Sequence, residues 1–137
     1  MSDVYSSAKR SEVMSLIRGK GNKQTEGVMV SLFRAEKITG WRRHLALPGR
    51  PDFTFRKERL TVFIDGCFWH GCPKCYRAPK GNPKFWADKV AYNRQHDLVV
   101  NRELKKRGWR VLRIWGHSLK RRDRKRLISR IEKSLCM

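Results

Sequence analysis

The chain has 137 residues, 39% of them hydrophobic and five of them tryptophan, so it is long and apolar enough to fold around a core rather than stay disordered. Its 33 lysines and arginines outnumber its 12 acidic residues and give a net charge of +21. Such a surplus is typical of a protein that binds a polyanion, above all nucleic acid. The alternatives are a ribosomal protein and a protein of anionic membrane surfaces.

No apolar run is long enough to span a bilayer, and no signal-peptide core follows Met1. We therefore expect a cytoplasmic protein without a membrane partner, whose thiols stay reduced. The sequence contains no repeat and no low-complexity linker, which predicts a single domain over residues 1–137.

Residues 1–22 form a polar and basic arm, in which SEVMSLI has the pattern of a short helix capped by Ser11. Residues 25–37 are predicted to form an amphipathic helix with Thr25 near its N-cap. The apolar side chains that recur at helical spacing are Val28, Met29, Leu32 and Phe33.

After the turn LPGRPD, the stretches DFTFR and LTVFI read as two strands joined by the charged turn KER. They are expected to pair as a hairpin, with Asp52 entering the first strand and Asp65 leaving the second. A long helix follows, with Asn82 as its cap, Pro83 at its first position and Gly108 as its terminator.

The stretch WRVLRIW predicts a buried strand, and residues 118–135 predict a basic closing helix. The apolar face of that helix consists of Leu127, Ile128, Ile131 and Leu135. The order helix, strand, strand, an optional third strand, helix, strand, helix predicts an α/β fold with a mixed sheet flanked by helices.

The stretch DGCFWHGCPKC holds three cysteines, Cys67, Cys72 and Cys75, in a loop. Under reducing conditions this spacing favours a metal over disulfides, and a structural zinc site needs a fourth ligand. We favour His117, because it follows WRVLRIW, a strand that could neighbour LTVFI. The other candidates for this ligand are His70, His96 and Cys136, and a reduced thiol core is the alternative to a metal site.

Asp52 and Asp65 stand at the ends of one hairpin, where they can converge into the oxygen-rich site that Mg²⁺ requires. Hydrolysis of a phosphodiester uses such a metal to polarise the phosphoryl oxygen and to lower the pKa of the attacking water. The alternative for Asp52 is a plain turn residue after Pro51.

Four further residues add weaker signals of the same kind. Glu26 lies at a helix N-terminus, where the helix dipole favours a carboxylate in any case. Asn93 and Asp97 share one face of the long helix, and His70 is either a general base or a surface histidine. Together with the two aspartates, they indicate a metal-dependent nuclease.

Three blocks, LPGRPDF, VFIDGCFWHGCPKC and FW…N…D…LKKRGWRVLRIW, resemble the very short patch repair (Vsr) endonucleases in order and spacing. The resemblance implies a restriction-endonuclease-like core related to the PD-(D/E)xK nucleases. It also implies a DNA mismatch endonuclease that nicks one strand 5′ to the thymine of a T:G mismatch left by deamination of 5-methylcytosine. Such an enzyme initiates very short patch repair, with a structural Zn²⁺ and a catalytic Mg²⁺.

The resemblance assigns catalytic roles residue by residue. Asp52 matches the essential metal-binding aspartate, and Ile64 falls where a main-chain carbonyl binds Mg²⁺. His70 matches the histidine that transfers a proton to or from the attacking water, and Asp97 an aspartate that contacts metal-bound water. The remaining catalytic candidates are Glu26, Asn93 and Asp65, and at Asp65 the chain departs from the family pattern, which has histidine.

The resemblance also assigns the zinc and the DNA-intercalating residues. One familiar set of zinc ligands in the family is Cys-His-Cys-Cys. At or next to those positions this chain has Cys67, Cys72, Cys75 and His117, so cysteine and histidine ligands are exchanged. That exchange is conservative for zinc. Phe68 and Trp69 match intercalating aromatics, and Met14 matches a methionine from the N-terminal arm.

The implied partner is double-stranded DNA with a T:G mismatch, together with mismatch-repair proteins of the MutL type. The chain is expected to act as a monomer at the nucleoid. Two alternatives stay open: a nickase or restriction-type nuclease that reads other sequences, and a non-catalytic zinc-containing module that binds nucleic acid. Asp52, Asp65 and Asp97 argue against the pure binder, because carboxylates beside phosphate repel it.

Overall fold

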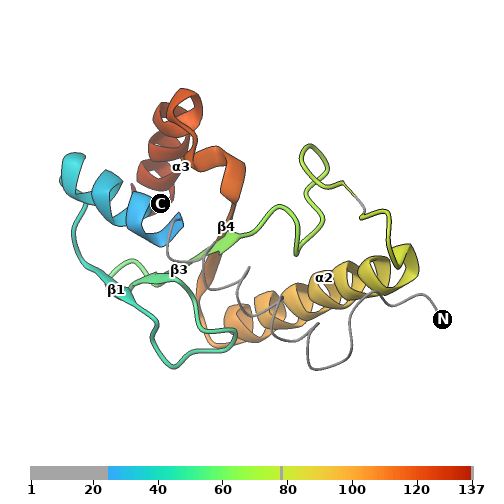
Figure 1. Cartoon of the computed structure of the whole chain (residues 1–137). Helices are drawn as coiled ribbons and strands as arrows, with labels where there is room; N and C mark the ends of the chain where they lie inside the picture. Colours follow the sequence, from blue (N-terminus) through green and yellow to red (C-terminus); the bar gives the residue numbers. More distant parts are fainter. Residues whose placement is uncertain (1–24, 78, 137) are drawn as a thin grey trace.

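The computed structural model describes residues 25–77 and 79–136 (Figure 1). The N-terminal arm over residues 1–22, its SEVMSLI stretch and Met14 lie outside this part. Residues 25–35 are helical. They are followed by β1 (Trp41–Arg43), β2 (Phe53–Phe55), β3 (Leu60–Asp65), α2 (Pro83–Lys106), β4 (Arg110–Trp115), the 3₁₀ turns η1 (Gly116–Leu119) and η2 (Arg121–Asp123), and α3 (Arg124–Cys136).

The described strands form one sheet in the order β1-β2-β3-β4. The pairs β1–β2 and β2–β3 are antiparallel, whereas β3 and β4 are parallel and are connected through α2. The mixed sheet and the predicted hairpin are therefore confirmed. The additional strand is β1, which precedes the hairpin instead of following it. Within the described residues, no helix is long and apolar enough to cross a membrane.

Each face of the sheet packs against its own helices (Figure 1). On one face, Val62 and Ile114 join Met29 of the N-terminal helix and Ile131 of α3 in the larger core. On the other face, Phe63 packs against α2. Burial of each large aliphatic or aromatic side chain contributes about 1.5–3 kcal/mol, so these two layers hold the strands in place.

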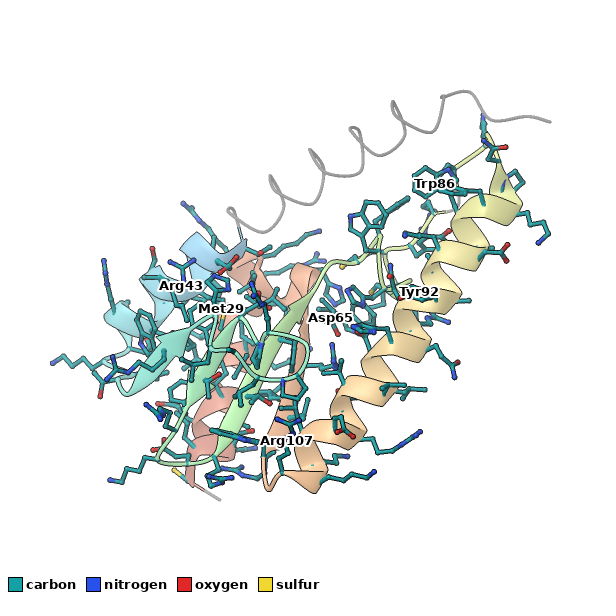
Figure 2. All side chains as sticks on the ribbon, turned by 90° about the horizontal axis from the view of Figure 1, so that it is seen from below. Met29, Arg43, Asp65, Trp86, Tyr92 and Arg107 are labelled. Carbon is teal, nitrogen blue, oxygen red and sulfur yellow. The ribbon has the colours of Figure 1, made fainter. Side chains whose placement is uncertain are left out.

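The alternation of side chains along a strand determines which residues face α2. Phe63 lies in the core on the α2 side and pairs with Arg113 across β3 and β4. Asp65, two residues along β3, must point to the same face as Phe63. Figure 2 shows Asp65 in the space between the sheet and α2. A charged layer thus continues the α2-side core at the carboxyl ends of the two parallel strands.

The structure corrects two sequence predictions at the C-terminal end. The closing helix does not begin at residue 118, because two 3₁₀ turns precede α3, which begins at Arg124. Their short-range bonds, from Lys120 N–H to His117 O and from Asp123 N–H to Lys120 O, replace helical ones. In addition, β4 is not a buried strand: only Ile114 is fully buried, because β4 is an outer strand of the described sheet.

The ends of α2 follow the predicted signals, with one difference. Pro83 is the first helical residue, and Gly108, with φ of 85°, follows the C-cap Arg107. Asn82 occupies the N-cap position but makes no side-chain capping hydrogen bond. Its backbone is left-handed, with φ of 53°, a conformation that asparagine tolerates better than most residues.

Candidate active site and metal centre

A cleft of about 550 Å³ opens where β3 ends, between the loop after β3 and the middle turns of α2. Nearly all the residues predicted for catalysis and intercalation that the structure describes line this cleft. They are Asp52, Ile64, Asp65, Phe68, Trp69, His70, Asn93 and Asp97, joined by Arg113, which the sequence did not single out.

Asp52 is anchored by the backbone of the neighbouring strand. The antiparallel register that pairs Phe53 with Val62 brings Asp52 beside the end of β3, and Ile64 N–H donates a 2.7 Å hydrogen bond to Asp52 Oδ2. Burial, together with the nearby Glu26 and Asp65, raises the pKa of Asp52 to about 6 against the opposing Ile64 hydrogen bond and His44. The ionised form is therefore costly in the metal-free chain.

Glu26 approaches Asp52 from the N-terminal helix, although it does not line the cleft itself. It is buried, and its Oε1 accepts a hydrogen bond from Arg43 Nη2 at 2.9 Å and lies 2.7 Å from His44 Nε2. Ligand atoms of Glu26, His44 and Asp52 all lie within 4.8 Å of one another. Two carboxylates and an imidazole thus meet at one corner of the cleft.

This corner fits a hard divalent cation. Mg²⁺ prefers carboxylate and carbonyl oxygens and keeps several waters of its own. Asp52 provides such an oxygen, and its hydrogen bond from Ile64 N–H holds it beside the main chain of Ile64. The raised pKa of Asp52 is what a carboxylate shows when burial and like charges surround it without a counter-ion, and a bound cation would reverse it.

His70 and Asp97 form a second group on the opposite wall. Nδ1 of His70 lies 2.5 Å from Oδ2 of Asp97, so Asp97 fixes the orientation of the ring. The other ring nitrogen, Nε2, lies 3.9 Å from Asp65 Oδ1, beyond hydrogen-bond distance. A histidine held at one nitrogen by a carboxylate and open at the other can move a proton at the open nitrogen.

Arg113 links the two aspartates of this wall. Its Nη1 lies 2.9 Å from Asp65 Oδ1 and 3.3 Å from Asp97 Oδ1, and its guanidinium lies over the ring of Phe63. Burial raises the pKa of Asp65, and Arg113 opposes that effect. Arg113 therefore places one positive charge between Asp65 and Asp97.

The loop that carries His70 is tied to α2 by backbone contacts. Asn93 Nδ2 donates to Trp69 O at 2.7 Å, and Arg94 donates to the carbonyl oxygens of His70 and Gly71. Gly71 has φ of 66°, a left-handed conformation that favours glycine. Asn93 thus positions the loop that carries His70.

Phe68 and Trp69 belong to a small aromatic cluster outside the two main cores. Their rings contact each other edge-on at 5.2 Å, and each contacts Trp86 of α2, at 5.4 and 6.0 Å. Both are partly exposed and both line the catalytic cleft. The turn after β3 therefore presents two adjacent aromatics to the same cavity. In a strand, two successive side chains would point to opposite faces of the sheet.

Cys67, Cys72, Cys75 and His117 converge on one point at the end of β4. Each sulfur lies 3.4 to 3.5 Å from His117 Nδ1. A tetrahedral zinc with Zn–S of about 2.3 Å and Zn–N of about 2.0 Å has sulfur–nitrogen edges of about 3.5 Å, so the donor set fits zinc. The other candidates lie elsewhere: His70 is with Asp97, His96 stacks on Tyr92, and Cys136 is exposed at the end of α3.

Arg43, His44 and Arg113 were missed by sequence reasoning. Arg43 ends β1 and His44 follows it with φ of 52°, in a region without regular periodicity. Arg113 carried a usable signal, because a charged residue in the middle of an apolar strand indicates a partner of opposite charge.

Comparison with known proteins identifies the family. A family model described as DNA mismatch endonuclease Vsr matches residues 2–77. The chain is 33% identical to the DNA mismatch endonuclease Vsr of Escherichia coli (strain K12) over 141 residues, which cover 99% of this chain and 89% of that protein.

Two type II nicking enzymes are also similar. V.NaeI of Lentzea aerocolonigenes is 39% identical over 114 residues, which cover 80% of this chain and 69% of that protein. V.NmeAIP of Neisseria meningitidis serogroup A is 36% identical over 123 residues, which cover 88% of this chain and 86% of that protein. The matching family model and the near-complete coverage of the Escherichia coli protein show that the chain belongs to the Vsr family of DNA mismatch endonucleases.

Proposed function

We propose that the chain is a Mg²⁺-dependent endonuclease that nicks one strand of duplex DNA 5′ to the thymine of a T:G mismatch and so initiates very short patch repair. The observation that supports this best is the content of one cleft in a chain of the Vsr family. A buried carboxylate, an oriented His–Asp pair and two adjacent aromatics, Phe68 and Trp69, face the same cavity.

Asp52 and the main-chain carbonyl of Ile64 would hold the Mg²⁺. When bound, the ion polarises the phosphoryl oxygen and lowers the pKa of the attacking water. Asp52 suits this role because its charge is costly without a cation and its second oxygen is fixed by the Ile64 N–H. Glu26 contributes further negative potential at this corner.

His70 would accept the proton of the attacking water at Nε2, while Asp97 holds Nδ1 and stabilises the imidazolium that forms. Asp65 and Arg113 keep Asp97 in place, and Asn93 holds the loop beneath the ring.

Phe68 and Trp69 would enter the base stack at the mismatch, with Met14 from the N-terminal arm as a third wedge. Inserting a side chain between base steps costs a few kcal/mol per step, and this cost is lower at a mispaired step. The lower cost of opening the base stack at a mismatch would then contribute to selection of the T:G pair. The packing on Trp86, edge-on for Phe68 and tilted for Trp69, supports the proposal, because both rings so held line the cleft.

The Cys67, Cys72, Cys75 and His117 set would hold a structural Zn²⁺ that fixes this loop relative to β4. Burial raises the pKa of the Cys67 thiol to about 11, so metal uptake would release a proton and become more favourable as the pH rises. We further propose one restriction-endonuclease-like domain over residues 1–137, acting as a monomer at the nucleoid with mismatch-repair proteins of the MutL type as partners.

The names of the type II nicking enzymes among the relatives favour a second candidate, a nickase that acts in another sequence context. The Asp52 and His70 chemistry would be unchanged, and only the bases read around the nick would differ. Arg50 and Lys89 line the catalytic cleft and are candidates for these base contacts.

A panel of duplexes separates the two candidates. Single-turnover nicking is measured on otherwise identical duplexes with T:G, other mismatches or T:A at one position, in several flanking sequences. The proposal expects nicking only 5′ to the thymine of T:G and only with Mg²⁺. Equal rates on T:G and T:A duplexes would favour the second candidate, and the Asp52→Asn variant serves as the inactive control for both.

A further inference from the structure

A second cleft, of about 600 Å³, opens between the cysteine loop and α3. Loop residues Cys72 to Cys75 form one wall, and η1, η2 and α3 form the other. The two clefts share no lining residue, and α2 and α3, which line one cleft each, lie on opposite faces of the sheet (Figure 1). The catalytic roles assigned above use no residue of its basic wall.

The second cleft carries an unbalanced positive charge. Its cationic lining residues are Lys74, Lys120, Arg122, Arg126 and Arg130, whereas Asp123 is the one carboxylate among the lining residues. A zinc held by three thiolates and a neutral imidazole would add one further negative charge. Three of the five positive charges would still lack a counter-charge in the lining.

Two of the five cations already have protein contacts. Arg122 Nε lies 3.4 Å from Asp123 Oδ2, and Arg130 Nη2 donates to Arg113 O at 3.3 Å. Lys74, Lys120 and Arg126 are exposed, and none of them makes an ion pair within the described part of the chain. These side chains are free to bind an external anion.

The start of α3 supports the same conclusion independently. The first turn contains Arg124 and Arg126 with Lys125 between them and holds no acidic residue. A helix dipole favours anions at its N-terminus and opposes cations there. Three successive cations are therefore placed where folding alone disfavours them, and a polyanion bound nearby would offset that cost.

We propose that this second cleft binds the sugar–phosphate backbone of the DNA duplex beside the nicking site, as a contact independent of base sequence. The proposal rests on the DNA-nicking function proposed above and extends it with a separate anchoring site. Phosphate contacts fix the register of a protein on DNA and carry no sequence information. The cleft therefore contributes affinity and positioning equally on mismatched and paired duplexes.

The test compares two double variants with the same loss of charge. Lys120→Gln/Arg126→Gln removes two cations that line the cleft, and Lys57→Gln/Lys133→Gln removes two exposed cations that neither line it nor lie in the first turn of α3. Binding to a fluorescent duplex is measured by anisotropy without Mg²⁺ over a range of salt concentrations. Zinc content and thermal melting are recorded for both variants to show that they are folded.

The cleft variant is expected to bind both T:G and T:A duplexes several-fold to about tenfold more weakly than the wild type. The slope of log affinity against log salt should fall by about two, because each lost phosphate contact removes about one counterion. The control variant should lose clearly less in both quantities. If the two folded variants lose equal affinity and slope, the proposal is refuted.

An acidic protein segment is the rival occupant. If DNA binding by the cleft variant matches that of the control, while binding of a polyglutamate probe is lost only in the cleft variant, the cleft serves a protein and not DNA. Failure of T:G specificity would be visible separately, in the wild-type ratio of nicking rates on T:G and T:A duplexes. That ratio does not depend on Lys120 or Arg126.

Discussion

Asp52 gives the sharpest prediction, because we expect its carboxylate to be required for nicking and yet to destabilise the metal-free fold. Burial raises the pKa of Asp52 from 3.8 to about 6. A folded state that binds the proton more tightly than the unfolded chain loses stability as the pH rises from 3.8 towards 6. With about 1.4 kcal/mol per pKa unit, the ionised carboxylate costs the metal-free fold up to about 3 kcal/mol above pH 6.

The Asp52→Asn variant removes this charge and keeps an oxygen that can accept from Ile64 N–H. It should therefore be more stable than the wild type at neutral pH, by up to about 3 kcal/mol, and should not nick DNA. The difference should vanish below pH 3.8 and grow up to about pH 6. Urea unfolding of the zinc-loaded protein without Mg²⁺, repeated across this pH range, measures it.

Two controls make the measurement specific. Asp88→Asn changes an exposed carboxylate of α2 that pairs with Lys84, and it should alter stability by a few tenths of a kcal/mol at most. Added Mg²⁺ should stabilise the wild type by mass action and leave Asp52→Asn unchanged. An Asn variant that is less stable than the wild type above pH 6, or a difference that is the same at all pH values, would refute the reasoning.

The other predictions test single parts of the site. Replacing Cys72 by Ala should lower zinc content and melting temperature together, because metal binding is folding free energy; elemental analysis of the wild type that finds no zinc in active protein would contradict it. His70→Ala should slow nicking by about 10²-fold or more with zinc content unchanged, whereas loss of zinc would place His70 in the metal set. Arg113→Met should lower the free energy of unfolding by about 3 kcal/mol, as urea unfolding would show, since it leaves Asp65 and Asp97 without their shared cation. Phe68→Ala and Trp69→Ala should reduce the ratio of nicking rates on T:G and T:A duplexes with only a slight fall in melting temperature; Phe85→Ala is the control, because Phe85 touches Trp86 and does not line the cleft.

Local patterns in the sequence predicted those parts of the molecule whose determinants lie close together in the chain. Pro83 and Gly108 mark the ends of α2, and the spacing of apolar residues marks the buried face of α3. Asp52 was identified because a turn and two short strands fix its position relative to Ile64. The cysteine cluster was identified for the same reason, since its three sulfurs lie in one loop.

The parts that were missed depend on which strands become neighbours. Arg113 meets Asp65 only because β4 lies parallel to β3 and places Arg113 opposite Phe63. If WRVLRIW formed a central strand of the sheet, the positive charge of Arg113 would need a different partner. The late start of α3 was missed because 3₁₀ and helical turns share the same residue preferences over a basic stretch such as residues 120–126.

The distribution of counter-ions in the cleft supports the choice of Asp52 as the metal-binding carboxylate. Glu26 is paired with Arg43, Asp65 with Arg113, and Asp97 with His70 and Arg113. Asp52 is bound by a backbone N–H, and no lysine or arginine makes an ion pair with it among the described residues. A chain with a net charge of +21 has no shortage of cations to place there. The position left without one is therefore the position where an external divalent cation gains most, and a phosphate can approach this carboxylate only after the cation has neutralised it.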